Sequence, residues 1–482
     1  MDRISELPHE ILGSILSLLP LKEAVATSVL SRHWRYAWAW STLTLDFDPE
    51  ETLVGFKYHS RTLQNKKSHR YVNWVNRVVE QHSGPNIKLF RACFDLDRRF
   101  TSSIDKWIEF ALKKRVQVLV LDFVKEYGIN KDSYMFPRKL LGLEEGFASR
   151  RCVGLKSLKV LSFNFVDVTG EILEHFLSVC PFLERLSVSF VEKLVNLRVV
   201  GSSIALKYLK LEECDDLKRV EIYDTNLVSF IHTGTAIDLR LSNVPSLVEV
   251  AITSQRNDIA RLCASTAFMR LAFTQLACCL YQLETLMINT QVAEYNKDYT
   301  FPILPNLKHL ELTVEGDYKL SLSQLSSFMK ASPYLQRLAL KLRFWEEPFN
   351  EGRKIKKAAK CPHHYIKVVE VSGYCDRTNA VEHVMFLMEN VVALEKLVIV
   401  PYWSWDCHHS GSESGKRERK KEAKSNGSFA ECRSYLLDRF VGFLYSLVAK
   451  VLSSQEFVYE RDQKRVLEMA PWTYWRFLDA TR

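Results

Sequence analysis

The sequence predicts a mixed α/β repeat protein, in which three N-terminal helices precede an irregular solenoid of short strands. The composition is that of a folded chain, with 47% hydrophobic and 26% charged residues among 482. Apolar residues recur at helical spacing within the first forty positions. A six-residue apolar pattern then returns, mostly at intervals of 20 to 28 residues. Together these observations indicate one helical segment followed by stacked strand-containing repeats.

The first forty residues are predicted to contain three short helices. Pro8 suits the first turn of a helix, Pro20 ends it, residues 21–30 form a second, and Ser31 can cap a third. One broad face of the first helix is apolar, and it consists of Ile11, Leu12, Ile15, Leu16 and Leu19. Helices this short cannot bury so much apolar surface alone. Part of it should therefore face either a partner or the rest of the chain.

The same segment carries a specific motif. It reads Ile4-Ser-Glu-Leu-Pro-His-Glu-Ile-Leu12, followed by Ile15-Leu-Ser-Leu-Leu-Pro20 and Ala24-Val-Ala-Thr-Ser-Val-Leu-Ser-Arg-His-Trp-Arg35. Over about residues 3–40 this closely resembles an F-box, which in that family docks on the Skp adaptor of cullin-RING ubiquitin ligases. The resemblance implies adaptor contact at the matching positions Leu7, Pro8, Ile11, Leu12, Ile15, Leu19, Pro20, Val29, Leu30 and Trp34.

The middle of the chain repeats an L-x-x-L-x-L cassette. Cassettes begin at Leu158, Leu183, Leu206, Leu227, Leu247, Leu283, Leu307 and Leu335. A further cassette is expected near Val116, and Leu43-Thr-Leu45 is expected to form the first strand. Most intervals fall in the range of leucine-rich repeats, and one longer interval of 36 residues contains an apolar insertion. Each cassette predicts a strand whose alternate residues point into a stacked core. The asparagine that usually follows is missing from most repeats, so the solenoid should be irregular.

The positions that alternate with the buried leucines should line a concave face. They are Arg185, Tyr208, Lys210, His309, Glu311 and Arg337. Their mixed charges favour a protein ligand over a polyanion. For any one of these residues, a solvated sheet face without a ligand remains the alternative.

The C-terminal third begins with a predicted strand–helix–strand unit. Residues 361–373 read as a turn, a strand and a glycine break, Val381 to Val391 fit a helix, and Leu394-Glu-Lys-Leu397-Val-Ile399 repeats the cassette. Over about residues 355–400 this unit looks like the FBD module that follows leucine-rich repeats in a large plant-type F-box family. Zinc ligand types are present but without paired spacing, at Cys361, His363, His364, Cys407, His408 and His409. No metal or cofactor is therefore expected.

The predicted organisation has five parts. They are an F-box (1–42), degenerate leucine-rich repeats (43–345), an FBD module (346–405), a basic Ser/Gly linker (406–427) and a helical C-terminal extension (428–482). The linker contains Lys416-Arg-Glu-Arg-Lys-Lys421, which favours a solvated segment, with nuclear import as the alternative. The chain has eleven cysteines, no C-x-x-C, two early acidic residues and no clean apolar span. These features indicate the nucleus or the cytoplasm, or both, and no membrane insertion.

Phosphate-loop, dinucleotide-binding, H-E-x-x-H and G-x-S-x-G motifs are absent from the sequence. We therefore expect a non-catalytic substrate receptor. The F-box would bind the Skp adaptor, and through it the cullin and RING subunits, while the repeats hold an unidentified target protein. The alternatives are an F-box scaffold without target turnover and a basic regulator that binds nucleic acid; nucleic acid is the less expected partner.

Overall fold

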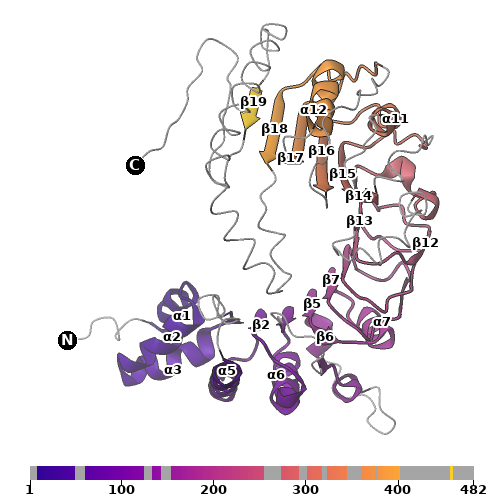
Figure 1. Ribbon diagram of the computed structural model, residues 1–482. Helices are drawn as coiled ribbons and strands as arrows, with labels where there is room; N and C mark the ends of the chain where they lie inside the picture. The colour runs from indigo at the N-terminus through magenta and orange to yellow at the C-terminus, as the bar shows by residue number, and fades with distance from the viewer. Residues whose placement is uncertain are drawn as a thin grey trace, which may run out of the picture. The chain divides into compact units, whose positions relative to one another are not determined.

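The computed structural model (Figure 1) describes residues 8–48, 60–123, 133–142, 154–253, 273–291, 301–316, 323–344, 360–374, 378–401 and 456–459. The chain forms two compact units. Unit 1 comprises Met1–Asn257 with Gln275–Cys279, and unit 2 comprises Asp258–Thr274 with Leu280–Arg482. None of the helices in the described ranges has the length and hydropathy needed to cross a bilayer.

Three short helices open unit 1, as the apolar spacing predicts. They are α1 (His9–Ser17), α2 (Leu21–Ala26), which continues into the 3-10 turn η2 (Thr27–Val29), and α3 (Arg32–Ser41). Pro8 and Pro20 immediately precede α1 and α2. The Ser31 hydroxyl accepts the Trp34 N–H at 3.3 Å and so caps α3.

The three helices share one apolar core. Leu12 and Leu16 of α1 and Trp34 and Trp38 of α3 are all buried, and α1 packs on α3. A Cβ at Gly13 would lie 3.2 Å from the Cβ of Ser41. Glycine thus permits this close approach, although within a helix it costs about 1 kcal/mol relative to alanine.

Eight parallel strands form the main sheet of unit 1, in the order β1-β2-β3-β5-β7-β9-β11-β13. They are β1 (Thr44–Phe47), β2 (Leu89–Cys93), β3 (Val118–Asp122), β5 (Val160–Asn164), β7 (Arg185–Ser189), β9 (Tyr208–Glu212), β11 (Ser229–Thr233) and β13 (Glu249–Thr253). Each cassette predicted in this part of the chain supplies one of them. Cassette leucines align across strands and are buried, for example Leu161, Leu186 and Leu209. Strand β2 was not predicted, because its pattern Ile87-Lys-Leu-Phe90-Arg-Ala92 lacks leucine at the key positions.

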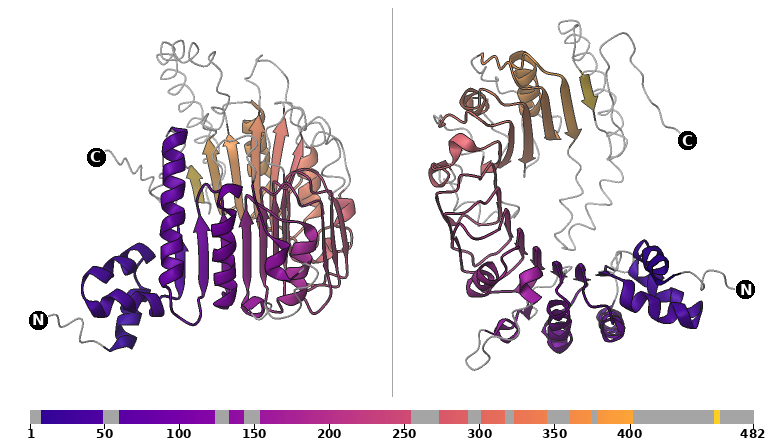
Figure 2. Two further views of the ribbon diagram at one scale, coloured as in Figure 1. Left: turned by 90° about the horizontal axis from the view of Figure 1, so that it is seen from below. Right: turned by 180° about the vertical axis from the view of Figure 1, so that it is seen from behind.

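A second layer covers one face of this sheet (Figure 2). Its helices are α5 (Arg61–Gln81), α6 (Thr101–Lys113), which follows η4 (Arg98–Phe100), and α7 (Gly170–Val179). After α7 the layer continues as a parallel three-stranded sheet of β8 (Asn196–Val200), β10 (Arg219–Tyr223) and β12 (Asp238–Ser242). Short pieces complete the layer: β4 (Tyr134–Met135) pairs with β6 (Val166–Asp167), beside η5 (Arg138–Leu141) and η6 (Gly154–Ser157).

Repeat length decides whether a helix or a strand forms this second layer. The interval from Leu158 to Leu183 is 25 residues and holds α7, whereas the next intervals of 23, 21 and 20 residues hold β8, β10 and β12. Ten helical residues rise about 15 Å, and five extended residues span about the same distance. A strand therefore crosses the layer with fewer residues. The contact is tight where α7 meets β8, because a Cβ at Gly170 would lie 2.0 Å from the Asn196 carbonyl oxygen.

Unit 2 contains a second series of parallel strands. These are β14 (Thr285–Gln291, after η7, Leu280–Gln282), β15 (His309–Gly316), β16 (Arg337–Phe344), β17 (Val368–Tyr374), β18 (Lys396–Pro401) and β19 (Glu456–Tyr459). Helices α11 (Ser323–Ala331) and α12 (Thr378–Asn390) connect neighbouring strands. The predicted strand–helix–strand unit is therefore present as β17, α12 and β18. The predicted glycine break is a register shift between Ser372 and Tyr374.

The main strands of unit 1 end in a repeated left-handed turn. Phe165, Phe190 and Glu213 follow β5, β7 and β9 with φ of 55°, 54° and 49°, and Gly234 follows β11 with φ of 146°. Each N–H donates to the last carbonyl of the next strand in the sheet, at 2.6 to 3.0 Å. The rings of Phe165 and Phe190 stack at 4.6 Å. These backbone hydrogen bonds join neighbouring repeats at the edge where the usual asparagine is missing.

Much of the predicted C-terminal organisation lies outside the described residues. This holds for the linker 406–427 and for most of the extension 428–482. Within the extension Glu456–Tyr459 is described, and it forms β19 parallel to β18 instead of the expected helix. Its sequence Glu-Phe-Val-Tyr is rich in β-branched and aromatic residues, which favour strands.

Candidate protein-binding surfaces

Exposed apolar side chains gather on the N-terminal helices. Ile11 is 48% exposed, Leu30 60%, Leu18 84% and Val29 86%. The two prolines that precede α1 and α2 are exposed as well. We call Pro8, Ile11, Leu18, Pro20, Val29 and Leu30 the N-terminal apolar surface. Several exposed apolar side chains on so short a segment are typical of an interaction site.

Other predicted contact residues lie deeper in the segment. Leu12 is fully buried and Trp34 is 3% exposed, so both belong to the core between α1 and α3 and not to the surface. Ile15 and Leu19 are half-buried, and Leu7 lies outside the described residues. The apolar residues of α1 differ in exposure because this helix is apolar on two sides. One side packs on α3, and the other remains exposed.

Leu18 is a surface residue that sequence reasoning missed. Ile11, Ile15 and Leu18 are spaced at i, i+4 and i+7, which places them on one side of α1. Leu12 and Leu16 occupy the buried side. The i, i+4, i+7 spacing could have predicted this exposure, because Leu18 continues the exposed side of α1 into the turn before Pro20.

The N-terminal helices are fastened to the first repeats. The backbone N–H groups of Ser83 and Gly84 both donate to the Ala39 carbonyl, at 2.9 and 3.1 Å. The buried His82 ring donates from Nε2 to the Thr42 carbonyl at 2.9 Å. Burial lowers the pKa of His82, which keeps the ring neutral. These bonds tie the end of α3 to the end of α5.

Helix α5 is in turn anchored in the sheet by Tyr71. Its buried hydroxyl donates to the Phe47 carbonyl at 2.8 Å and accepts the Cys93 N–H at 3.0 Å. It thereby bridges the last residues of β1 and β2, where a direct ladder bond would otherwise form. The Tyr71 ring stacks on Phe94 at 4.5 Å, and burial raises the pKa of the phenol. The N-terminal helices and the first repeats therefore share one continuous set of contacts.

On the repeat face of unit 1, the predicted residues Arg185, Tyr208 and Lys210 lie on neighbouring strands. The Arg185 guanidinium sits 3.7 Å from the centroid of the Tyr208 ring, and the two residues are register partners. Lys210 pairs with Glu212 at 2.8 Å. The arrangement offers a flat cationic and aromatic surface, of a kind enriched in protein interfaces.

The predicted residues of unit 2 form a second group. His309 and Arg337 are register partners on β15 and β16. Arg337 pairs with Glu370 at 3.0 Å, and Glu311 pairs with Lys341 at 2.6 Å. All three predicted residues thus lie on adjacent strands, in a network of alternating charge.

A polar row that sequence reasoning missed ends the strands of unit 1. Asn164 donates from Nδ2 to Asp122 Oδ1 at 2.6 Å, and Arg91 pairs with Asp48 at 2.6 Å. Burial raises the pKa of Asp122, and burial next to Asp122 raises that of Cys93 to about 12. The sequence signal is the residue that follows each cassette, which is polar in several repeats.

Two of the described histidines, His363 and His232, hold the backbone through hydrogen bonds. His363 donates from Nε2 to the Ser332 carbonyl at 2.9 Å, and its Nδ1 accepts the Ile366 N–H at 3.2 Å. His232 likewise donates to the Thr235 carbonyl at 2.8 Å, and burial lowers the pKa of both rings. Within the described ranges no group of His, Cys, Asp and Glu could hold a metal ion. Cys407, His408 and His409 lie outside those ranges.

Comparison with known proteins places these features in a family. Residues 4–46 match the F-box domain model, and residues 78–437, about three quarters of the chain, match the model described as At1g61320/AtMIF1, LRR domain.

The chain is similar to several Arabidopsis thaliana proteins. It is 26% identical to F-box/FBD/LRR-repeat protein At5g22700, over 83% of this chain and 92% of that protein. It is 29% identical to FBD-associated F-box protein At4g10400, over 70% and 77%. It is 31% identical to putative F-box protein At3g58860, over 52% and 56%. The three exposed helices, the stacked parallel strands and these matches lead to one conclusion: the chain belongs to the plant F-box/LRR-repeat/FBD protein family.

Proposed function

We propose that this F-box protein is a substrate receptor of a Skp–cullin–F-box ubiquitin ligase and performs no chemistry itself. The observation that carries the proposal is the N-terminal apolar surface within the F-box match. It would dock on the Skp adaptor, while the repeat faces around Arg185 and Arg337 would hold a target protein. Residues 346–405 would act as an FBD module that extends the repeats.

The contacts between the helices and the repeats support a receptor of this kind. The hydrogen bonds of Ala39 and Thr42 would hold the first repeats in a fixed orientation to a docked adaptor. Tethering through linked sites raises the local concentration of a bound target. A rigid connection between the N-terminal helices and the first repeats would also fix the position of the bound target relative to the adaptor.

The test is a direct titration of the full chain with purified Skp adaptor. The variant Val29→Asp/Leu30→Asp removes two of the most exposed apolar side chains without touching the core. Given their exposure, burial of both is worth about 2–4 kcal/mol, so we expect Kd to rise about 30- to 1,000-fold. Val392→Asp, which changes an exposed valine of unit 2, is the matched control and should leave Kd unchanged.

Two results would contradict the proposal. One is that the folded wild type does not bind the adaptor. The other is that the double variant and the control bind as the wild type does, since docking would then use a different surface.

We also propose that the protein acts in the nucleus, the cytoplasm or both. The basic run Lys416-Arg-Glu-Arg-Lys-Lys421 supports a nuclear component. A fluorescent fusion should lose nuclear signal when the five Lys and Arg residues at 416, 417, 419, 420 and 421 are changed to Gln. An unchanged distribution would remove the nuclear part of this proposal.

A further inference from the structure

One helix of the repeat layer, α5, carries a marked excess of positive charge. The formal net charge of the whole chain is +9. The 21 residues of α5 contain five Lys or Arg residues and one acidic residue, Glu80, which is a net +4. Lys66, Arg70 and Arg77 are exposed and lie at i, i+4 and i+11, so they form one stripe along the helix.

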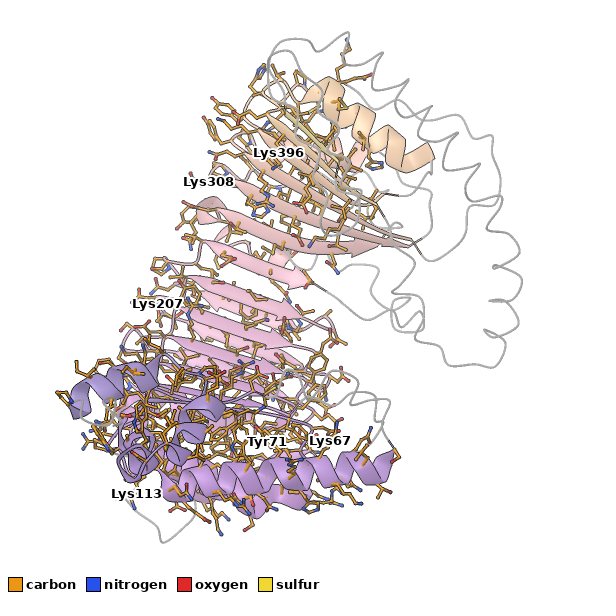
Figure 3. The ribbon with its side chains drawn as sticks, turned by 90° about the vertical axis from the view of Figure 1, so that its left-hand side faces the viewer. Lys67, Tyr71, Lys113, Lys207, Lys308 and Lys396 are labelled. Atoms are coloured by element: carbon orange, nitrogen blue, oxygen red, sulfur yellow. The ribbon has the colours of Figure 1, made fainter. Side chains whose placement is uncertain are left out.

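Helix α6 has no net charge, but it adds two exposed lysines beside α5. Its exposed stripe contains Lys106 and Lys113 with Glu109 between them. The two helices are held side by side, because Trp107 donates from Nε1 to Asn76 Oδ1 at 2.7 Å. Figure 3 shows this layer from the side, with Lys67 labelled on α5 and Lys113 labelled at the end of α6. We call Lys66, Arg70, Arg77, Lys106 and Lys113 the basic ridge.

The ridge is not neutralised by the molecule itself. Several exposed cations elsewhere are paired, as in Lys308 with Glu284 and Lys367 with Glu395, both at 2.8 Å. Among the described residues, none forms an ion pair with any member of the ridge. Unpaired like charges held on two packed helices produce a positive potential that attracts anionic partners.

We propose that the basic ridge binds an acidic polypeptide segment of a protein partner. The side chains exposed on α5 and α6 favour a polypeptide over nucleic acid as the ligand. No Phe, Tyr or Trp side chain of α5 or α6 is exposed, and the Trp74 ring has the Lys22 ammonium 5.7 Å from its centroid. Single strands need such rings for stacking. Because α5 and α6 pack side by side, neither is a lone helix of the kind that enters the major groove of a duplex.

The dimensions fit a short peptide. From Lys66 to Arg77 the stripe runs about 16 Å, which about five residues of extended chain would cover. Asp and Glu side chains along such a segment could reach the Lys and Arg groups in turn. This inference goes beyond adaptor docking and does not depend on it.

The probe is a fluorescein-labelled poly-glutamate peptide of about twelve residues, titrated with the full chain at low ionic strength and followed by anisotropy. An exposed ion pair changes affinity by a factor of about 1.4 to 5. Lys66→Gln/Arg70→Gln/Arg77→Gln should therefore weaken binding about 3- to 150-fold. Glutamine has nearly the helix propensity of lysine, so the fold is preserved. The matched control is Lys330→Gln/Lys360→Gln/Lys396→Gln in unit 2, which should bind as the wild type does.

A second variant, Lys106→Gln/Lys113→Gln, tests the α6 half of the ridge independently and should weaken binding about 2- to 30-fold. Added salt should weaken wild-type binding. The proposal is overturned if the wild type does not bind the peptide, or if both ridge variants bind it like the control. It is also overturned if a short DNA duplex binds more tightly than the peptide and loses that affinity in the ridge variants. Because the Skp adaptor is absent from this assay, these outcomes leave the receptor proposal untouched.

Discussion

Removing the buried Tyr71 hydroxyl should measurably lower the stability of the first repeats. In Tyr71→Phe the ring and its stack on Phe94 remain, but two backbone groups lose their partner. These are the Phe47 carbonyl and the Cys93 N–H, at 2.8 and 3.0 Å from the hydroxyl. A buried polar group left without a hydrogen bond costs about 1–3 kcal/mol. With two such groups, we expect a loss of about 2–6 kcal/mol in the free energy of unfolding.

Urea unfolding, followed by circular dichroism at constant pH, measures this loss. The matched control is Tyr281→Phe, which removes the hydroxyl of a tyrosine that is 61% exposed and should change stability by less than about 0.5 kcal/mol. If Tyr71→Phe behaved like this control, the hydroxyl would not be bridging β1 and β2. That result would refute the explanation of how α5 is anchored.

Three further predictions concern stability. Leu12→Ala should cost about 2–5 kcal/mol in urea unfolding because the side chain is fully buried; a loss below about 1 kcal/mol would place Leu12 on the surface instead. Gly170→Ala should destabilise by about 1–3 kcal/mol or more, since its Cβ would overlap a backbone oxygen of β8; equal melting temperatures would argue against this contact. Among the histidines whose folded-state pKa is lowered by burial, the three most buried contribute stability that is fully present above about pH 6.5 and lost as the pH falls through the folded-state pKa. They are His82, His232 and His363. The urea midpoint should fall from pH 7.5 to 5.5, and replacing the three histidines with Gln should reduce that fall; an undiminished fall would show that other groups cause it.

The main strands could be predicted because the leucine pattern is local and periodic. Cassettes such as Leu183-Glu-Arg-Leu186-Ser-Val188 fix which side of the strand is buried. The strands β8 and β10 carry similar patterns, Leu194-Val-Asn-Leu197-Arg-Val199 and Leu217-Lys-Arg-Val220-Glu-Ile222. They were missed because one strand was assigned to each repeat. A strand can replace the helix when the repeat is short.

The candidate site was predictable only in part, because periodicity identifies apolar faces but not what covers them. Ile11 and Leu12 are adjacent and equally apolar, yet one is 48% exposed and the other fully buried. Tertiary packing of α1 on α3 makes that distinction. The Tyr71 hydroxyl bridges β1 and β2 by hydrogen bonds to residues more than twenty positions away, and no local sequence pattern predicts these bonds.

Docking of the Skp adaptor on the N-terminal apolar surface is the central claim, and hydrogen–deuterium exchange of the full chain with and without purified adaptor tests it most directly. Backbone amides that become covered by a partner exchange more slowly. We predict slower exchange in peptides that cover α1, α2 and η2, with β14 to β18 unchanged. Adaptor binding that protects only the repeats, or that leaves residues 9–30 exchanging at their original rate, would contradict the claim.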